Sequence, residues 1–342
     1  MSAPTTVRAA LLVRAGEVVV QQRPIPRPAP GEVAVRVQAV GVCGSDTHYY
    51  DHGRIGRFVV ESPLVLGHEA AGVIVELGDG VTDRRVGQRV SIEPGVPDLT
   101  CVQCRAGAYN LCANMRFHAT PPVDGAFTEQ VVVHAAFTHP VPDTMSDNAA
   151  ALLEPLSVGV WACRKAGVSP GDRVLVTGAG AIGLVCLQTA LAFGATEVTV
   201  SDVNPHRLAL ATDLGATRIV DASAITPWSG DPPTVLLECS GNGQATRWGV
   251  RLLDLGGRAV LVGMGGDTLD LPLSVVQERE LHLSGVFRYA NTWPTAIDLV
   301  TTGRVDLDRL VTSTYGLADV PHALTAARDD RRSIKAVVLP QT

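Results

Sequence analysis

The chain has 342 residues, of which 46% are hydrophobic and 18% charged, with a net charge of −6. This length predicts two domains. The absence of a Lys/Arg run argues against nucleic acid or an anionic membrane as a partner, and no apolar run is long enough to span a bilayer. The N-terminus has no apolar core typical of a secretion signal, and without one the seven cysteines favour thiols or metal ligands over disulfides. We therefore expect a cytoplasmic protein.

The first part of the sequence has the pattern of a barrel-like β domain. Two apolar segments joined at Gly16 predict a hairpin, and the alternate prolines that follow predict an extended connector. A strand with alternating valines comes next, followed by short β segments between Gly-rich turns. The expected strands are 7–13, 17–21, 32–40, 64–66, 71–77 and 89–92.

Three residue types that bind zinc occur in two Gly-flanked segments of this domain. His68 and Glu69 are adjacent in residues 67–72, and Cys43 lies in an expected loop over 41–48. Cys, His and Glu form a ligand set that suits zinc, with water as a fourth ligand. The alternative is a small buried Cys43 and a surface His-Glu pair.

A second group of cysteines follows the spacing D-x2-C-x2-C-x7-C, from Asp98 through Cys101 and Cys104 to Cys112. Two cysteines three residues apart and a third in the same loop resemble a structural zinc lobe. Three thiolates are one ligand short of a tetrahedron, and the Asp98 carboxylate could complete it. A loop of free thiols remains the alternative.

The pattern changes near residue 149. Residues 147–163 have helical composition, and from residue 171 strands and helices alternate, which predicts a parallel α/β sheet. Strands are expected at 173–177, 197–201, 234–238, 258–262 and 281–286, and helices at 184–193, 205–214 and 244–253. A helix over 293–302 and a strand over 335–339 complete the chain.

The first of these strands leads into a dinucleotide-binding fingerprint. Gly178, Gly180 and Gly183 form G-x-G-x-x-G after a strand and at the start of a helix, and Asp202 follows at the end of the next strand. Gly178 would make the turn, Gly180 would admit the pyrophosphate, and Gly183 would allow close packing. The Asp202 carboxylate would bind the adenosine ribose and repel a 2′-phosphate, so we expect NAD.

These motifs together resemble those of the zinc-dependent medium-chain dehydrogenases. Residues 67–81 match that family's zinc signature, G-H-E-x2-G-x5-G-x2-V, at every marked position. Within the family, the polyol (sorbitol and xylitol) dehydrogenases are most similar. Their likeness rests on residues 44–50 (GSDTHYY), 153–159 (LEPLSVG) and 285–294 (GVFRYANTWP), of which the last is the most specific.

The resemblance implies an α/β fold. A doubly wound Rossmann sheet over residues 157–288 would bind NAD, and a GroES-like β-barrel catalytic domain would comprise residues 1–156, with 289–342 returning to it. It also implies that Cys43, His68 and Glu69 hold a catalytic zinc, with Glu154 at its water or replacing Glu69. Asp98 departs from the four-cysteine members, so a structural zinc in the lobe stays open.

Further roles follow from matching positions. The resemblance implies proton-relay roles for Ser45 and His48. Substrate contacts are implied for Tyr50, Phe117, Thr120, Glu154, Arg288 and Tyr289, and cofactor contacts for Gly178, Gly180, Ile182, Gly183, Asp202, Arg207, Val262, Val286, Phe287 and Arg288.

The implied reaction is hydride transfer from a secondary alcohol of a polyol to NAD, which gives a ketose. The partners expected are a small sugar alcohol and further copies of the chain in a dimer or tetramer. Two alternatives remain at this point. One is another secondary-alcohol, threonine or cyclitol dehydrogenase of the same family, and the other is a nucleotide-binding protein with a structural or regulatory role.

Overall fold

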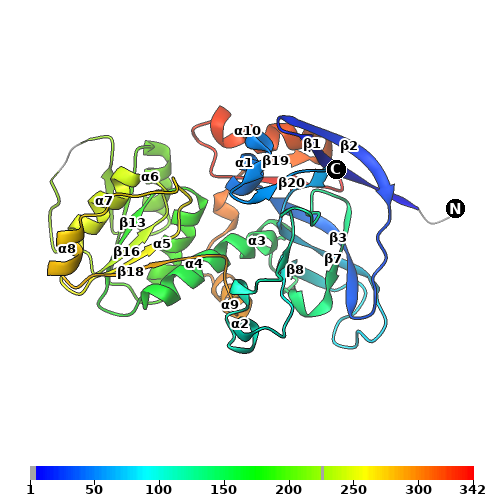
Figure 1. Cartoon of the computed structure of the whole chain (residues 1–342), viewed down its shortest axis with the longest axis horizontal. Helices are drawn as coiled ribbons and strands as arrows, with labels where there is room; N and C mark the ends of the chain where they lie inside the picture. Colours follow the sequence, from blue (N-terminus) through cyan, green and yellow to red (C-terminus); the bar gives the residue numbers. More distant parts are fainter. Residues whose placement is uncertain (1–4, 225–226) are drawn as a thin grey trace. The chain divides into compact units, whose positions relative to one another are not determined.

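The computed structural model describes residues 5–224 and 227–342 (Figure 1). It divides into two compact units, one formed by Met1–Glu154 with Leu307–Thr342 and the other by Pro155–Asp306. The expected boundaries were 156/157 and 288/289, so the segment 289–306 falls in the second unit of this division.

A hairpin begins the first unit. Strand β1 (Thr6–Arg14) pairs antiparallel with β2 (Glu17–Pro24) and with the short β6 (Leu64–Val65). The expected hairpin is therefore confirmed, and β2 runs slightly further than predicted. Proline has no backbone N–H to donate to a neighbouring strand. Pro24 is tolerated at the end of β2 because β2 is an edge strand of its sheet.

Strand β3 (Glu32–Gly41) organises the larger, seven-stranded sheet of the first unit. It pairs antiparallel with β7 (Glu69–Leu77), with β11 (Gln130–His134) and with β20 (Lys335–Leu339), which comes from the far end of the chain. The alternating valines of β3 are fully buried in the core. The other members are β8 (Arg89–Ile92), β12 (Thr138–Pro140) and β19 (Val311–Gly316).

The expected loop over 41–48 is wrong from Gly44 onward, where helix α1 (Gly44–His52) begins. Cys43 is its N-cap residue, and the Asp46 carboxylate accepts a hydrogen bond from the Cys43 N–H at 3.0 Å. The side chains of this segment are mostly polar, so the sequence shows no apolar face that would predict a helix. The remaining small elements of the unit are β4 (Arg54–Ile55), β5 (Phe58–Val59), β9 (Gly95–Val96), β10 (Arg116–Phe117), α2 (Val102–Arg105), α3 (Asp147–Ala151) and α10 (Val320–Asp329).

The second unit contains a six-stranded parallel sheet in the order β15-β14-β13-β16-β17-β18. In chain order this is 3-2-1-4-5-6, the Rossmann arrangement. Its strands are β13 (Arg173–Thr177), β14 (Glu197–Asp202), β15 (Arg218–Asp221), β16 (Val235–Glu238), β17 (Arg258–Leu261) and β18 (His282–Gly285). Sequence analysis missed only β15, a four-residue edge strand with two exposed residues and therefore a weak pattern.

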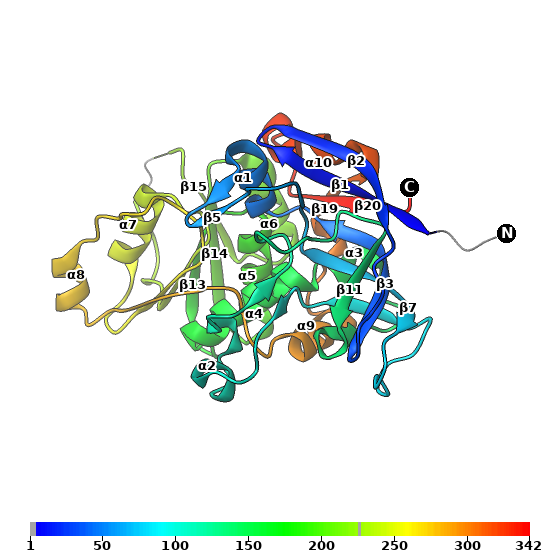
Figure 2. The ribbon, with the colours of Figure 1, turned by 45° about the vertical axis from the view of Figure 1, so that its right-hand side comes forward.

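Helices α5 (Ala181–Ala192) and α6 (Pro205–Asp213) pack on this sheet (Figure 2). The centre of strand β13, residues 174–176, is continuously apolar because parallel strands are covered on both faces. The remaining helices are α4 (Leu153–Ala166), α7 (Gly243–Leu252), α8 (Leu273–Glu278) and α9 (Trp293–Thr301). The expected α/β class with a doubly wound sheet is confirmed.

Candidate metal centre and cofactor site

Cys43, His68 and Glu69 converge in the first unit, with one ligand atom of each lying within 4.8 Å of the others. The pairing of β3 with β7 brings them together. It sets Gly41, which lies two residues before Cys43, opposite Glu69. A side chain at position 41 would collide with Glu69, since its Cβ would lie 2.0 Å from Oε2. A thiol, an imidazole and a carboxylate at this spacing suit zinc.

Asp46 holds the two ligand segments together, and sequence analysis had not assigned it a role. Its buried carboxylate accepts hydrogen bonds from the N–H groups of Gly67 at 2.9 Å and Cys43 at 3.0 Å. It also lies 3.7 Å from Nδ1 of His68. Burial lowers the pKa of His68, but the charges of Asp46 and Cys43 outweigh burial and raise it overall. A carboxylate beside a ligating histidine fixes the orientation of the ring.

Lys335 is a second residue that the sequence did not reveal. Its Nζ donates to both carboxylate oxygens of Glu69, at 2.7 and 2.9 Å, and to the Val42 carbonyl at 2.9 Å. Burial works against the charge of Lys335, whereas Glu69, Cys43 and Glu154 favour it, so its pKa is raised. Glu69 therefore has a cationic partner in the protein besides any metal ion, and Glu154 adds negative charge to the same group.

Other predicted residues of the first unit lie around this set. Helix α1 carries Ser45 and His48, and the His48 ring packs on His52 at 4.6 Å between centroids. The centroid of the Phe117 ring lies 5.6 Å from that of the His68 ring, so Phe117 packs directly beside the candidate metal ligands. Tyr50 packs against the hydrophobic core of the unit, and the Thr120 N–H donates to the Phe117 carbonyl.

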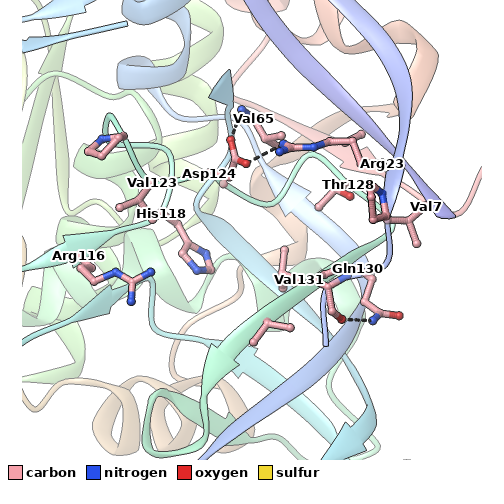
Figure 3. A pocket seen from close by; sticks show the side chains of 16 residues that line it. Val7, Arg23, Val65, Arg116, His118, Val123, Asp124, Thr128, Gln130 and Val131 are labelled. Atoms are coloured by element: carbon pink, nitrogen blue, oxygen red, sulfur yellow. Dashed lines mark hydrogen bonds and ion pairs between the residues drawn. The ribbon is translucent and has the colours of Figure 1, made fainter. Parts of the chain in front are cut away.

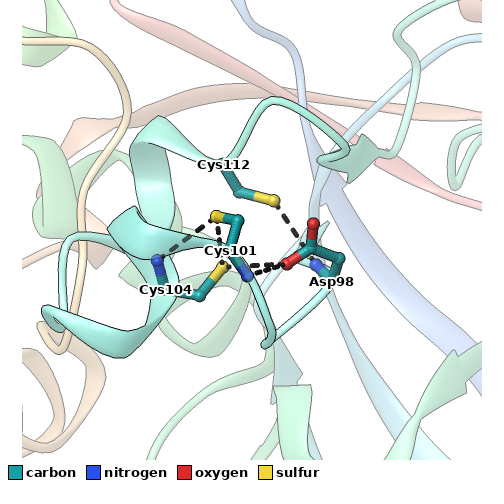
Figure 4. Close-up of side chains that lie close together, drawn as sticks. All are labelled: Asp98, Cys101, Cys104 and Cys112. Atoms are coloured by element: carbon teal, nitrogen blue, oxygen red, sulfur yellow. Dashed lines mark hydrogen bonds between the residues drawn. The ribbon is translucent and has the colours of Figure 1, made fainter.

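The four lobe residues also converge, as Figure 4 shows. Asp98 accepts hydrogen bonds from the N–H groups of Thr100 and Cys101 and from the Asn114 side chain. These bonds hold the pKa of its carboxyl well below the usual range. The pKa of Cys101 is lowered, chiefly by the Cys104 N–H, whereas burial raises that of Cys104 to about 12. One ligand atom of each of the four residues lies within 4.8 Å of the others. This convergence favours a metal site over a loop of free thiols.

The glycine fingerprint has the backbone geometry that the sequence predicted. Gly178 has a φ of +90°, and a Cβ on Gly183 would lie 1.8 Å from the Gly178 carbonyl oxygen. Nothing lies within 4 Å of the Cβ position of Gly180, so a ligand can approach there. Asp202 ends β14 and accepts hydrogen bonds from the N–H groups of Ala179 at 2.6 Å and Asn204 at 2.8 Å.

A cavity of about 550 Å³ opens at this turn, within the second unit. Gly178, Gly180, Asp202 and Arg207 line it, and Nε of Arg207 is buried with no partner among the described residues. Donor groups at the start of α5 suit an anionic pyrophosphate. Sequence analysis missed several further lining residues, which follow β16 or lie on α7: Ser240, Asn242, Gln244, Ala245 and Trp248.

The other predicted contacts of the second unit do not line this cavity: Ile182, Gly183, Val262, Val286, Phe287, Arg288 and Tyr289. Val262 and Val286 directly follow β17 and β18, at the carboxyl edge of the sheet. Tyr289 is buried and packs on Trp293 with centroids 5.2 Å apart, and Arg288 covers the Phe287 ring.

Comparisons with known proteins agree with this geometry. Residues 29–143 match the alcohol dehydrogenase GroES-like domain, and residues 181–302 match the zinc-binding dehydrogenase domain. Sorbitol dehydrogenase from Gallus gallus is 42% identical over 318 residues, covering 90% of each chain. An oxidoreductase/dehydrogenase of unknown specificity from Escherichia coli has a similar structure, with a TM-score of 0.92, 34% identity and coverage of 98% of this chain and 99% of that one.

Two further solved structures carry nicotinamide cofactors. A short chain alcohol dehydrogenase from E. coli, complexed with NADH, has a TM-score of 0.92 and 28% identity, covering 98% of this chain and 100% of that chain. A putative zinc-binding dehydrogenase from Sinorhizobium meliloti, bound to NADP, has a TM-score of 0.90 and 30% identity at the same coverage.

The chain belongs to the zinc-dependent medium-chain dehydrogenase family. It is an enzyme of the zinc alcohol dehydrogenase type that uses a nicotinamide cofactor, which rules against the structural or regulatory alternative. The GroES-like domain accompanies the Rossmann sheet, as expected. Among the described residues, none of the helices has the length and apolar composition needed to cross a membrane.

Proposed function

We propose that the protein oxidises a secondary alcohol of a polyol, such as sorbitol or xylitol, to a ketose with NAD. The observation that carries this proposal is the convergence of Cys43, His68 and Glu69 beside the Phe117 ring. The sorbitol dehydrogenases among the relatives and the residues of 285–294 support a polyol over other alcohols. We also propose a dimer or tetramer, as in the family that the sequence resembles.

In this mechanism Cys43, His68 and Glu69 would hold zinc, with Glu154 beside them. When bound, zinc supplies a Lewis acid that makes the substrate hydroxyl more acidic, and the nicotinamide supplies the hydride acceptor. Asp46, 3.7 Å from Nδ1 of His68, would fix the orientation of that ring. Ser45 and His48 would carry the hydroxyl proton toward solvent, since a hydroxyl and an imidazole can each both donate and accept a proton.

Substrate class is tested by a panel of alcohols with NAD, followed through the absorbance of the reduced cofactor. We expect the highest kcat/KM with an acyclic polyol, and lower values with threonine and with a cyclitol. His68→Ala should abolish turnover while leaving NAD binding intact. A preference for threonine or the cyclitol would select the alternative members of the family, and turnover by metal-free His68→Ala would exclude this mechanism.

We further propose that NAD is preferred over NADP because of Asp202. A carboxylate facing the ribose diol accepts charge-assisted hydrogen bonds worth ~1.5–3 kcal/mol. The same carboxylate would repel a 2′-phosphate. We expect kcat/KM to favour NAD by at least ~100-fold, since ~1.4 kcal/mol corresponds to a factor of ten.

The variant Asp202→Ala tests this preference. It should lose efficiency with NAD and gain some with NADP, where Arg207 becomes available to the phosphate. Equal kcat/KM for both cofactors in the unmodified enzyme would mean that Asp202 does not face the ribose.

A further inference from the structure

A second cavity, of about 650 Å³, lies in the first unit (Figure 3). It is bounded by β1, the end of β2, β11 and the segment 116–125. None of the proposed zinc ligands, relay residues or substrate contacts lines it. Its volume is in the range of small-molecule sites, which run from roughly 300 to 1,000 Å³.

Most polar side chains of this cavity already have partners. Arg23 pairs with Asp124 at 2.7 Å, and the other Asp124 oxygen accepts from the Val65 N–H at 2.9 Å. Gln130 donates to the Pro26 carbonyl, and Thr128 donates to that of Arg8. These groups are therefore satisfied within the protein, and the Arg23–Asp124 pair contributes no net charge.

Two side chains differ from the rest. His118 is only 9% exposed, and its Nδ1 has no hydrogen-bond partner among the described residues. Arg116 is an exposed residue, and its guanidinium has neither an ion pair nor a side-chain hydrogen bond within residues 5–224 and 227–342. In Figure 3 the Arg116 guanidinium extends toward the His118 ring. His118 lines the cavity together with Arg116, so a ligand bound there would meet both side chains.

The charge of the cavity defines the charge of that ligand. Burial, together with His68 and Arg116, lowers the pKa of His118 to about 4, so the ring is neutral near pH 7. Arg116 then contributes the one uncompensated charge. A guanidinium matches a carboxylate through two parallel hydrogen bonds. The remaining wall is aliphatic, from Val7, Val65 and Val131 with Pro24 and Pro26.

We propose that this cavity binds a small monocarboxylate with a short apolar body, held by Arg116 and His118. The carboxylate would lie against Arg116, with His118 offering a further hydrogen bond, and the hydrocarbon part would contact the valines and prolines. Cys43, His68 and Glu69 do not line this cavity. The proposal does not depend on which alcohol the enzyme oxidises.

Calorimetric titration of the zinc-loaded enzyme with pentanoate tests the proposal. We expect saturable binding at one site per chain, with 1-pentanol, which lacks the charge, and inorganic phosphate, which lacks the apolar body, at least tenfold weaker. Arg116→Gln should weaken pentanoate binding tenfold or more. The matched control Arg85→Gln, at an exposed arginine of the same unit, should leave it unchanged.

A carboxylate could instead bind the catalytic metal, and a second arm separates the two sites. Metal-free enzyme and Cys43→Ser should retain pentanoate binding if the cavity is the site. Val132→Phe, at a half-buried lining position, should remove binding without loss of the fold. Binding that disappears with the metal but survives Arg116→Gln overturns the proposal, as does phosphate or pentanol binding as tightly as pentanoate.

Discussion

Glu69 illustrates how a single side chain can serve both the fold and the site. Both of its oxygens accept hydrogen bonds from Lys335, and both groups are almost wholly buried. A buried carboxylate left without a cation costs several kcal/mol, and Lys335 supplies that cation before any metal arrives. In the zinc-loaded enzyme the ion would become a second cation beside the same carboxylate.

Lys335→Met should therefore destabilise the metal-free protein by about 3 kcal/mol, because it leaves the Glu69 charge buried and unpaired. With zinc bound the loss should be smaller, since the ion then compensates the carboxylate. Urea denaturation with and without a chelator measures both values. Lys165→Met, at the only other lysine and an exposed one, is the control. An equal loss in both metal states would argue that Glu69 does not ligate zinc.

His118 should make the protein sensitive to acid. Its pKa of about 4 in the folded state lies below the ~6.5 of an unfolded chain, so protonation favours unfolding. The stability that this histidine contributes is present above pH ~6.5 and is lost as the pH falls toward 4, on the order of 3 kcal/mol in all. His118→Phe should flatten this part of the stability profile, measured by thermal unfolding. The exposed His206→Phe should not.

The predicted metal-ligand residues that converge in the structure are those whose motifs are local in the sequence. Cys43, His68 and Glu69 stand in short Gly-flanked motifs, and the lobe residues share one loop. Lys335 could not be found in this way, because it lies 266 residues from Glu69 and reaches it only through the pairing of β20 with β3. Asp46 carries no motif of its own, and its role appears only once Gly67 and Cys43 donate to it.

At the scale of elements, the lobe around α2 shows how a short segment can depend on a metal. Its helix has only four residues, and none of them is buried. Hydrogen bonds to Asp98 and contacts among three thiols hold the segment together. Such a segment has little apolar surface to stabilise it, so a bound ion would supply much of its order.

We predict that zinc in this lobe binds more weakly than zinc at Cys43, His68 and Glu69, because Asp98 supplies a hard oxygen where a thiolate is usual. Mild chelation should lower the metal content toward one ion per chain while activity persists. Asp98→Cys should raise the melting temperature in the presence of zinc, whereas Asp143→Cys, an exposed control, should not. Simultaneous loss of both ions with activity would reverse this ranking.

The elements that the sequence predicted well have strong periodicity or strong turn signals. Strand β13 and helix α5 flank the glycine fingerprint, and the β1–β2 hairpin has Gly16 at its turn with a φ of +77°. Helix α1 was missed because most of its side chains are polar, so it has no apolar face. Helix α10 and strand β19 were also missed, since they fall in the last, weakly patterned part of the chain.

At the scale of the whole molecule, the two units differ in how the chain forms them. The second is one continuous segment with its own sheet and core, whereas the first needs both Met1–Glu154 and Leu307–Thr342. All four tryptophans lie between residues 161 and 293, so tryptophan fluorescence reports on the second unit alone.

A fragment from Leu153 to Asp306 should therefore fold by itself and bind NAD without zinc. Trp248 lines the cofactor cavity, so NAD should change its fluorescence. The same fragment with Asp202→Ala should bind NAD more weakly. In a fragment of residues 1–306 the first unit should be unfolded, because β3 then lacks its partner strand β20. Circular dichroism distinguishes these results, and an unfolded 153–306 fragment would contradict the independence of the second unit.

The pairing of β20 with β3 has a consequence for how the protein is made. A ribosome releases β3 early, yet its neighbour emerges only after more than 290 further residues, between Gly41 and Lys335. The nucleotide-binding unit is complete before then and can fold while translation continues. Until β20 is synthesised, β3 has an unpaired edge and Glu69 lacks the cation of Lys335. We expect chaperones to bind this incomplete state. Assembly of the metal centre would therefore be a late step, which follows the synthesis of the nucleotide-binding unit.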